Sequence, residues 1–392
     1  MPTKKPAKMR DGIIQRAPGK YSYIVRETDP ETGAKRTRWV SGFPTRDAAK
    51  AARDKARTDV RTGTYVPPSR DTVGEWLEDW LGVVELLRKP TTASGYRWIS
   101  ERYLIPAIGN VRLQALTPIR LTRLWADLAA TGGEGGGSLS PKTVSMIRGT
   151  LRTALNKAVH NGMIVVNPVV LSELPSIIKV EEDEPEPLTV WDFAQQQVFL
   201  AANAESRWLI AWRIVFGTGL RRGEMCGLRW DAIDLDGGVL TVRRNRTQVR
   251  STIHEGTPKS RDSRRDVPLE PDLVAALRVW KREQAAERLA LGLGRDPEDR
   301  VLTWGDGHPV QPDYLSKEFA RAQIGLGLPR LRLHAARHSY GSALGAAGVP
   351  QVVISKLLGH SDIQMTNRYV HATESGKRDA VAQLAAARQA AI

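Results

Sequence analysis

A tyrosine near the C-terminal end of the chain, Tyr369, follows three clusters of basic residues that could serve the same reaction. The clusters hold Arg221, Lys259, and the pair His334 and Arg337, and His360 lies in the same run as the tyrosine. A phenol among such cations suits attack on a phosphodiester, because the transition state carries negative charge on non-bridging oxygens that cations must hold. The same set is poorly suited to acyl transfer or redox chemistry.

The spacing within these clusters supports a shared site. His334 and Arg337 are three residues apart and would share one face of a helix. The Arg337 guanidinium offers a forked pair of N–H donors to phosphate oxygens, which a lysine cannot match. Ser361 or Asp362 can cap the helix that presents Tyr369. A lone histidine or tyrosine on a helix is usually structural, but the joint occurrence of all these groups in one basic chain has no comparable structural explanation.

The charge of the chain indicates a polyanionic partner. Its 392 residues carry a formal net charge of +15 with a pI near 10.0, which favours nucleic acid. A basic ribosomal or membrane-surface protein would share this charge, so charge alone predicts only the class. The first 70 residues hold 17 Lys and Arg against 7 Asp and Glu, which concentrates most of the excess at the N-terminal end.

Cysteine use and hydrophobicity predict an intracellular protein. The single cysteine, Cys226, excludes an internal disulfide framework and a cysteine-based zinc site, and a small buried side chain is its favoured role. The N-terminal sequence lacks the apolar core of a signal peptide, and no apolar stretch is long enough to span a bilayer. We therefore expect a soluble, cytoplasmic protein with no membrane partner.

Residues 1–65 are expected to form a basic DNA-binding domain. Sequence patterns predict strands at 11–17, 20–27 and 35–41, followed by a helix from about 45 to 62. A small basic sheet of this kind can enter the major groove of DNA. The candidate DNA contacts here are Arg16, Lys20, Tyr23, Arg26, Lys35, Arg36 and Arg38. For Tyr23, packing of the sheet on its helix is the favoured alternative.

Residues 66–175 are expected to form a helical domain that also binds DNA. Thr72 can cap a helix with an amphipathic face, and further helices are predicted near 90–104, 117–130 and 141–160. Arg97, Lys142 and Arg148 could bind phosphates, although their charge is explained about as well by positions on a solvent-exposed helix face. Residues 176–187 contain four successive carboxylates and then alternating prolines, which predicts an extended tether.

Residues 188–392 would hold the chemistry in a mostly helical domain with a small antiparallel sheet. Predicted helices lie at about 191–203 and 207–217 and around Glu224, strands lie near 239–243, 247–254 and 264–269, and helices then return. Asp231, Asp234 and Asp236 fit a turn before the first strand far better than a metal site. The predicted fold class is therefore multidomain α+β.

The segment from about 188 to 391 resembles the catalytic domain of the tyrosine recombinase (phage integrase) family. The resemblance rests on Thr218-Gly219-Leu220-Arg221-x-x-Glu224, a lysine in a β-hairpin, His334-x-x-Arg337-His338, Leu358-Gly359-His360, and a tyrosine nine residues later. The middle domain is similar to the helical core-binding domain of that family. The basic N-terminal unit looks like the three-stranded arm-binding domain of many integrases.

The resemblance implies a role for each residue. Tyr369 would attack a DNA phosphate, forming a 3′-phosphotyrosine and freeing a 5′-hydroxyl. Arg221 and Arg337 would clamp the non-bridging oxygens, and Lys259 would protonate the leaving oxygen. His334 would assist proton transfer, His360 would hydrogen-bond the phosphate, and Glu224 would orient its neighbours. Arg222 would be a surface residue or a contact to the DNA backbone. Because the phosphotyrosine keeps the energy of the broken bond and arginines replace metal ions, no ATP, metal or other cofactor is expected.

The function implied is that of a site-specific integrase of a phage or mobile element. Such an integrase would work in a bacterial host cell, associated with the nucleoid. It would bind core and arm types of attachment site and act as a homotetramer, with a DNA-bending host factor and a directionality factor. A C-terminal helix at 374–392 would dock on its own domain or, as preferred, on a neighbouring protomer. The alternatives are a chromosome-dimer resolvase of the same family, a type IB topoisomerase, and a non-catalytic DNA-binding regulator.

Overall fold

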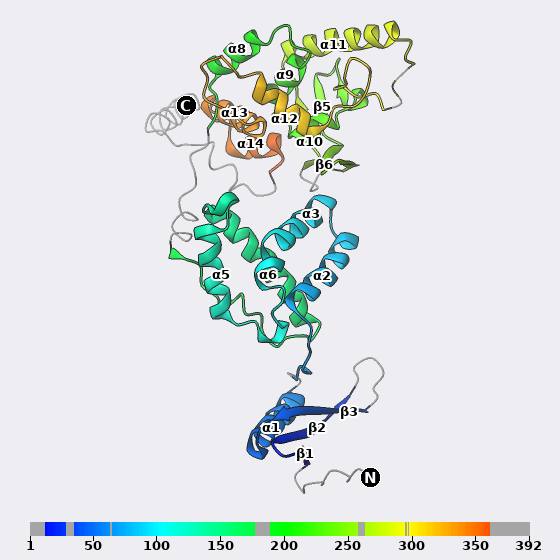
Figure 1. Ribbon diagram of the computed structural model, residues 1–392. Coiled ribbons are helices and arrows are strands. Elements are labelled where there is room, and N and C mark those ends of the chain that lie inside the picture. Colours follow the sequence, from blue (N-terminus) through cyan, green and yellow to red (C-terminus); the bar gives the residue numbers. More distant parts are fainter. Residues whose placement is uncertain are drawn as a thin grey trace, which may run out of the picture. The chain divides into compact units, whose positions relative to one another are not determined.

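The computed structural model describes residues 12–28, 35–62, 65–176, 189–257, 263–294, 296 and 298–360. Lys259, Tyr369, residues 177–187 of the predicted tether and the predicted C-terminal helix at 374–392 lie outside these residues. The chain, drawn in Figure 1, divides into two compact units, Met1–Pro185 and Glu186–Ile392. Each unit has its own hydrophobic clusters.

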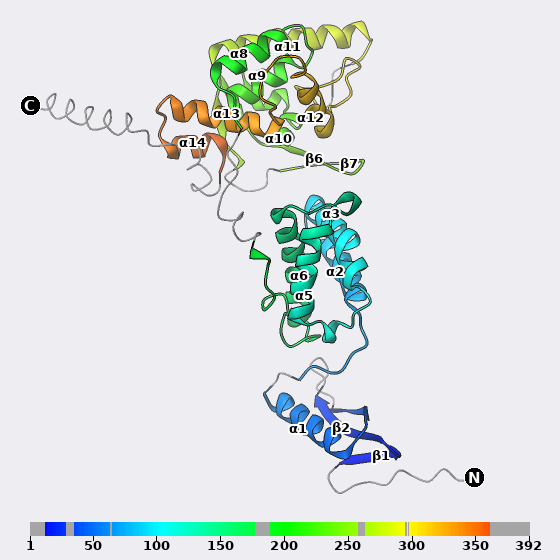
Figure 2. The same cartoon turned by 60° about the vertical axis from the view of Figure 1, so that its left-hand side comes forward.

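A three-stranded antiparallel sheet and one helix begin the first unit. The sheet has the order β1 (Ile13–Ala17), β2 (Lys20–Thr28) and β3 (Lys35–Phe43), and α1 (Arg46–Thr62) packs on it (Figure 2). β1 and β2 join at Gly19, whose φ of 70° suits a glycine turn. Tyr23 and Val25 of β2 pack against Ala56 of α1. The three predicted strands and the helix after them are confirmed.

The rest of the first unit is helical. Its elements are α2 (Val73–Leu87), α3 (Pro90–Ile99), a π-helical turn (Ser100–Leu104), α4 (Ile105–Ile108), η2 (Leu113–Ala115), α5 (Pro118–Thr131), η3 (Glu134–Gly136) and α6 (Pro141–His160). α2 begins at a capping box, in which Thr72 and Glu75 each accept from the other's backbone N–H. The indole N–H of Trp76 donates to the Ala154 carbonyl at 3.1 Å and ties α2 to α6.

The second unit packs helices around an aromatic core. Its helices are α8 (Phe193–Ala202), α9 (Leu209–Thr218), α10 (Arg222–Cys226), α11 (Pro271–Ala290), α12 (Pro312–Arg321), α13 (Leu333–Ala346) and α14 (Gln351–Leu358). Trp191, Phe199, Trp212, Phe216 and Phe319 pack ring against ring at its centre. α9 supplies two of these rings, and α13 joins the same core through Leu333 and Ala336, so the two helices are held in fixed positions.

A tight turn after α9 requires glycine. Gly219 ends the helix at a φ of 62°, and a Cβ on it would lie 2.5 Å from the Tyr340 ring and 2.9 Å from the Leu358 side chain. α9, α13 and α14 therefore meet closely at this residue, and Arg221 follows it two positions later.

The strands of the second unit form two small sheets. β4 (Ile233–Asp234), β5 (Val239–Thr241) and β8 (Asp266–Pro268) make one antiparallel sheet, and β6 (Asn245–Val249) with β7 (Thr252–Gly256) makes a hairpin. The prediction of a single strand over 247–254 was wrong, because the chain reverses at Arg250, which adopts a φ of 54°. The Asp234 carboxylate accepts backbone N–H bonds from Asp236 and Gly237, which confirms the predicted turn. Across the described residues, no helix has the length and hydrophobicity of a membrane span.

Candidate active site

Arg221 and Glu224 lie together at the start of α10. The Arg221 backbone N–H donates to Glu224 Oε2 at 3.0 Å, and its guanidinium Nη1 donates to Oε1 at 2.8 Å. Burial alone would raise the pKa of Glu224, but the charges and hydrogen bonds of Arg265 and Arg221 outweigh it and lower that pKa. Glu224 is therefore an ionised carboxylate that fixes the orientation of Arg221.

Arg337 lies on α13 and is 2% exposed. Its Nη1 donates to the carbonyl of Gly219 at 2.7 Å, and its Nη2 donates to the carbonyl of Leu358. The Arg221 guanidinium donates to the next carbonyl, that of Gly359, at 3.0 Å. The two arginines therefore converge on the end of α14, one residue before His360.

His334 precedes Arg337 by one helical turn on α13, as the spacing predicts. Desolvation by the surrounding protein lowers the pKa of His334 from its ordinary value, and the charges of Arg337, Arg221 and Arg222 lower it further. These effects favour the neutral imidazole, which can accept a proton.

His360 follows Gly359, the residue that caps the C-terminal end of α14. Its backbone N–H donates to the Ser355 carbonyl at 3.0 Å, and the Gly359 N–H donates to the Lys356 carbonyl at 3.1 Å. Gly359 adopts the left-handed conformation, with a φ of 62°, that commonly ends a helix. These bonds close the C-terminal end of α14 and fix the backbone from which His360 extends.

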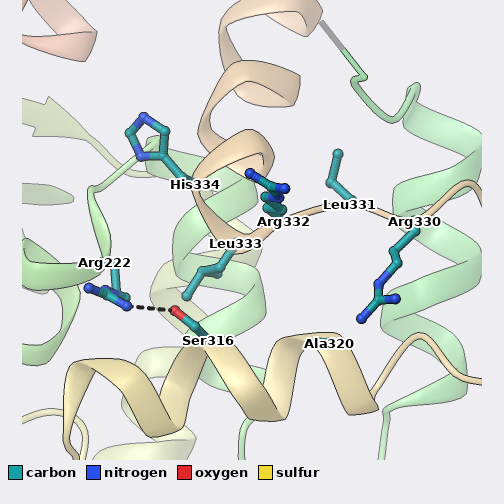
Figure 3. A pocket seen from close by; sticks show the side chains of 8 residues that line it. All are labelled: Arg222, Ser316, Ala320, Arg330, Leu331, Arg332, Leu333 and His334. Atoms are coloured by element: carbon teal, nitrogen blue, oxygen red, sulfur yellow. Dashed lines mark hydrogen bonds between the residues drawn. The ribbon is translucent and has the colours of Figure 1, made fainter. Parts of the chain in front are cut away.

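A basic cavity of about 860 Å³ lies beside His334, between α12 and α13. Figure 3 shows Arg222 on one side of it, with Arg330 and Arg332 on the segment that leads into α13. Arg222 is held by Asp313 at 2.9 Å and by the Ser316 hydroxyl at 3.1 Å. Arg330 and Arg332 are exposed. A cavity lined by three guanidiniums and an imidazole suits a phosphate-bearing ligand.

Three arginines of this region were missed in the sequence. Arg330 and Arg332 stand two residues apart just before His334, and this local concentration of charge was the available signal. Arg265 is 9% exposed, although it lies in a run of charged residues. Its signal was its spacing of two from the apolar Val267 in the predicted strand 264–269, because residues two apart on a strand face the same side.

The structure gives the DNA-contact candidates of the first unit different surroundings. Lys20, Arg26 and Lys142 are exposed, as a phosphate contact requires. Tyr23 is 5% exposed and lies 5.4 Å from the Phe43 ring, so it occupies the packing position that was the favoured alternative. The side chains of Arg16, Lys35, Arg36 and Arg38 lie outside the described part of the chain.

Two further candidates have partners within the helical part of the first unit. Arg97 forms ion pairs with Glu78, Glu85 and Glu101. Arg148 donates to the backbone carbonyls of Val169 and Ser172. These contacts orient both side chains, and their binding to phosphates stays a prediction.

Cys226 has the structural role expected for it. It is buried on α10, and burial raises the pKa of its thiol to about 12. The thiol is therefore protonated at neutral pH and is no nucleophile.

Comparison with known proteins places this arrangement in a family. Residues 192–375 match the model of the phage integrase family, and residues 72–128 match the model of the phage integrase N-terminal SAM-like domain. A tyrosine recombinase XerC-like protein of Caldanaerobacter subterraneus is 28% identical over 357 residues, covering 87% of this chain and 89% of that protein. An integrase of Saccharopolyspora erythraea is 26% identical over 368 residues, covering 80% and 82%.

Solved structures share the fold. The Tn1549 transposon integrase in complex with transposon right end DNA matches with a TM-score of 0.66 and 22% identity, over 80% of this chain and 99% of that chain. The lambda integrase tetramer bound to a Holliday junction matches with a TM-score of 0.55 and 17% identity, over 94% and 97%.

The fold and the family matches define a site-specific DNA recombinase in which a helical SAM-like part precedes the phage integrase part. The chain belongs to the tyrosine recombinase (phage integrase) family.

Proposed function

We propose that this site-specific DNA recombinase is an integrase that cuts and rejoins DNA through Tyr369. The observation that carries the proposal is the convergence of Arg221 and Arg337 on the backbone just before His360. Two guanidiniums at one point can hold the non-bridging oxygens of a phosphodiester. Tyr369 lies nine residues beyond His360, within the part of the chain that matches the family.

In the cleavage step, the Tyr369 oxygen attacks phosphorus and the bond from phosphorus to the 5′-oxygen breaks. The neutral His334 imidazole takes the phenol proton, and Lys259 gives a proton to the leaving 5′-oxygen. His360 donates a hydrogen bond to the phosphate. The products are a 3′-phosphotyrosine and a free 5′-hydroxyl.

In the rejoining step, the 5′-hydroxyl of a second DNA strand attacks the phosphotyrosine and releases Tyr369. The number of phosphodiester bonds is unchanged, because each broken bond is replaced by an equivalent ester. ATP is therefore not consumed.

The two arginines would meet the phosphate in different ways. The Arg221 side chain is 32% exposed and can contact DNA directly. Arg337 is 2% exposed, and the carbonyls of Gly219 and Leu358 accept from it. A phosphate oxygen therefore has to replace the Leu358 carbonyl as an acceptor, which requires a small shift at the end of α14.

The wider assembly follows from the same proposal. Residues 1–65 would hold arm-type sites, while 66–175 and 188–392, joined by the tether at 176–187, would enclose the core site. Four protomers would pair two duplexes, and the lambda integrase tetramer on a Holliday junction offers a parallel of the same fold. We include in this proposal a DNA-bending host factor and a directionality factor as partners. The segment 374–392 would dock on a neighbouring protomer, and the protein would reside on the nucleoid.

The experiment that tests the proposal measures strand exchange between the two junctions that flank the element and its empty target site. An integrase joins two different sites into two hybrid sites. Exchange confined to a pair of identical chromosomal sites would favour a chromosome-dimer resolvase. Relaxation of supercoils without exchange would favour a topoisomerase, and binding without any cleavage would favour a regulator.

The pH dependence of cleavage should report His334. Because the neutral imidazole is the active form and its pKa is lowered, the rate should fall only as pH drops through this pKa, on the acid side of an ordinary histidine. Arg222→Gln removes one of the charges that lower this pKa, so the acid limb should move to higher pH. Single-turnover rates across pH measure this, with Arg213→Gln on the exposed face of α9 as the control. Identical acid limbs in the wild type and Arg222→Gln would contradict the assignment.

The exposed arginines of the cavity should set part of the salt dependence of DNA binding. Replacing Arg330 and Arg332 together by glutamine should reduce the slope of log affinity against log salt by about 1.8, at about 0.9 for each lost phosphate contact. Titrations at several salt concentrations measure the slope, and Arg213→Gln should leave it unchanged. An unaltered slope in the double variant would place these arginines away from DNA.

A further inference from the structure

Three arginines from separate elements donate to three successive carbonyls at the end of α14. Arg265 Nε donates to Leu357 at 2.6 Å, Arg337 Nη2 donates to Leu358, and Arg221 Nη2 donates to Gly359 at 3.0 Å. The last carbonyls of a helix have no partner within the helix, and the negative end of its dipole attracts cations. The three guanidiniums therefore cap the segment that leads to His360 and on to Tyr369.

Arg265 differs from the other two arginines in its surroundings. Its side chain is 5% exposed and makes a two-point contact with Glu224, at 3.0 Å from Nη2 to Oε2 and 3.3 Å from Nη1 to Oε1. Nη1 also donates to the Ser263 carbonyl at 3.1 Å. Its charge is thus balanced inside the protein, and it has no surface to offer to DNA.

The backbone of Arg265 is fixed as well. The Val242 N–H donates to the Arg265 carbonyl at 2.8 Å, directly beside the β5–β8 ladder. The Arg265 backbone is therefore anchored beside the sheet, and its side chain contacts two other elements, α10 through Glu224 and α14 through the Leu357 carbonyl. It also follows Lys259 by six residues along the chain.

We propose that Arg265 is a positioning residue that keeps the end of α14 docked while Arg221 and Arg337 turn to the DNA phosphate. The inference rests on the proposed phosphate contacts of those two arginines. When they exchange carbonyls for phosphate oxygens, the Leu358 and Gly359 carbonyls lose these donors. The Arg265–Leu357 bond remains and holds the His360 segment in place, together with the apolar contacts of Ile354 and Leu358 with Tyr340.

Arg265 also acts on the site through Glu224. Its Oε1 accepts from both Arg221 and Arg265, and its Oε2 accepts from the Arg221 backbone and from Arg265. Arg265 therefore fixes the carboxylate that orients Arg221. One buried guanidinium links the phosphate-binding arginine with the segment that carries the nucleophile.

Arg265→Lys tests the inference, because a single ammonium cannot reproduce the contact with two oxygens of Glu224 and the bond to Leu357 together. The matched control is Arg207→Lys, in the same unit. Arg207 also donates to one backbone carbonyl, that of Thr303 at 3.0 Å, and to one carboxylate, that of Glu287 at 2.5 Å. Both variants are assayed as full-length protein for thermal unfolding, DNA affinity, covalent cleavage rate and amide exchange over residues 351–360.

We expect Arg265→Lys to bind a nicked core-site DNA with unchanged affinity and to form the covalent complex about 100-fold more slowly, as misplacement of a reacting group does. Amide exchange at 351–360 should increase most when DNA is bound. Arg207→Lys should cleave at the wild-type rate and keep α14 protected. Equal cleavage by Arg265→Lys and the wild type would overturn the inference, and so would faster exchange across the whole unit irrespective of DNA.

A second variant covers the case in which Arg265→Lys does not fold. Glu224→Gln combined with Arg265→Gln removes both charges, so that no unpaired charge is buried. It should fold, bind DNA and show the same slow cleavage; wild-type cleavage by this variant would also overturn the inference. If the wild type itself forms no covalent complex, the proposed function fails. If the wild type cleaves DNA and the Arg265 variants cleave it equally fast, only the positioning role is rejected.

Discussion

Tyr369→Phe should abolish covalent attachment of the protein to DNA while leaving its DNA affinity unchanged. The substitution removes one oxygen, the atom that is proposed to form the bond to phosphorus, and it keeps the aromatic ring. Incubation with a nicked core-site substrate, followed by denaturing electrophoresis, measures the covalent complex. Gel shift under native conditions measures the affinity.

The control for this prediction is Tyr314→Phe in the same unit. The Tyr314 ring packs on Trp304 with a centroid distance of 4.3 Å and on Trp208 at 5.6 Å, contacts that the phenyl ring keeps. This variant should form the covalent complex as the wild type does. Covalent complex in Tyr369→Phe would mean that another residue supplies the nucleophile.

Arg337→Lys should reduce the rate of covalent cleavage by about 10³-fold, the loss expected when a donor to developing negative charge is removed. The guanidinium bridges the carbonyls of Gly219 and Leu358 and is proposed to hold a phosphate oxygen as well. A lysine supplies one ammonium and cannot serve both sides of this bridge. Single-turnover cleavage at saturating protein measures the effect.

Thermal unfolding must accompany that measurement, because Arg337 is buried and its loss also removes packing. The rate is therefore compared at a temperature where the variant is folded and binds DNA. The same Arg207→Lys variant serves as the control for an arginine with a carbonyl and a carboxylate partner. Cleavage within about threefold of the wild-type rate, by folded Arg337→Lys, would exclude a phosphate contact, since the loss of such a donor costs far more.

Much of the fold follows from local rules that the sequence displays. Alternation predicts the three strands of the N-terminal sheet, and Thr72 with Glu75 marks the start of α2 through a capping box. The reversal between β6 and β7 could not be predicted in the same way. It occurs at Arg250, and a positive φ at an arginine carries none of the usual glycine or asparagine signals.

Site residues could be predicted from the sequence where they lie a few positions apart. Contacts between residues far apart in the sequence could not. His334 and Arg337 share a helical face because they are three apart, and Glu224 lies three residues after Arg221. The partner that holds Glu224 from the other side, Arg265, is 41 residues away and was hidden among other charged residues. The same limit applies to Arg97, since no local pattern shows that three glutamates surround it.

The most direct test of the central claim is to identify the residue that becomes attached to DNA. A nicked substrate traps the intermediate, because the short strand with the free 5′-hydroxyl diffuses away and cannot reseal the break. After digestion with protease and nuclease, mass spectrometry should find a nucleotide on a peptide that contains Tyr369, joined through its 3′-phosphate to the phenol oxygen. A nucleotide on any other residue, or a cleaved substrate with no attached peptide, would contradict the account.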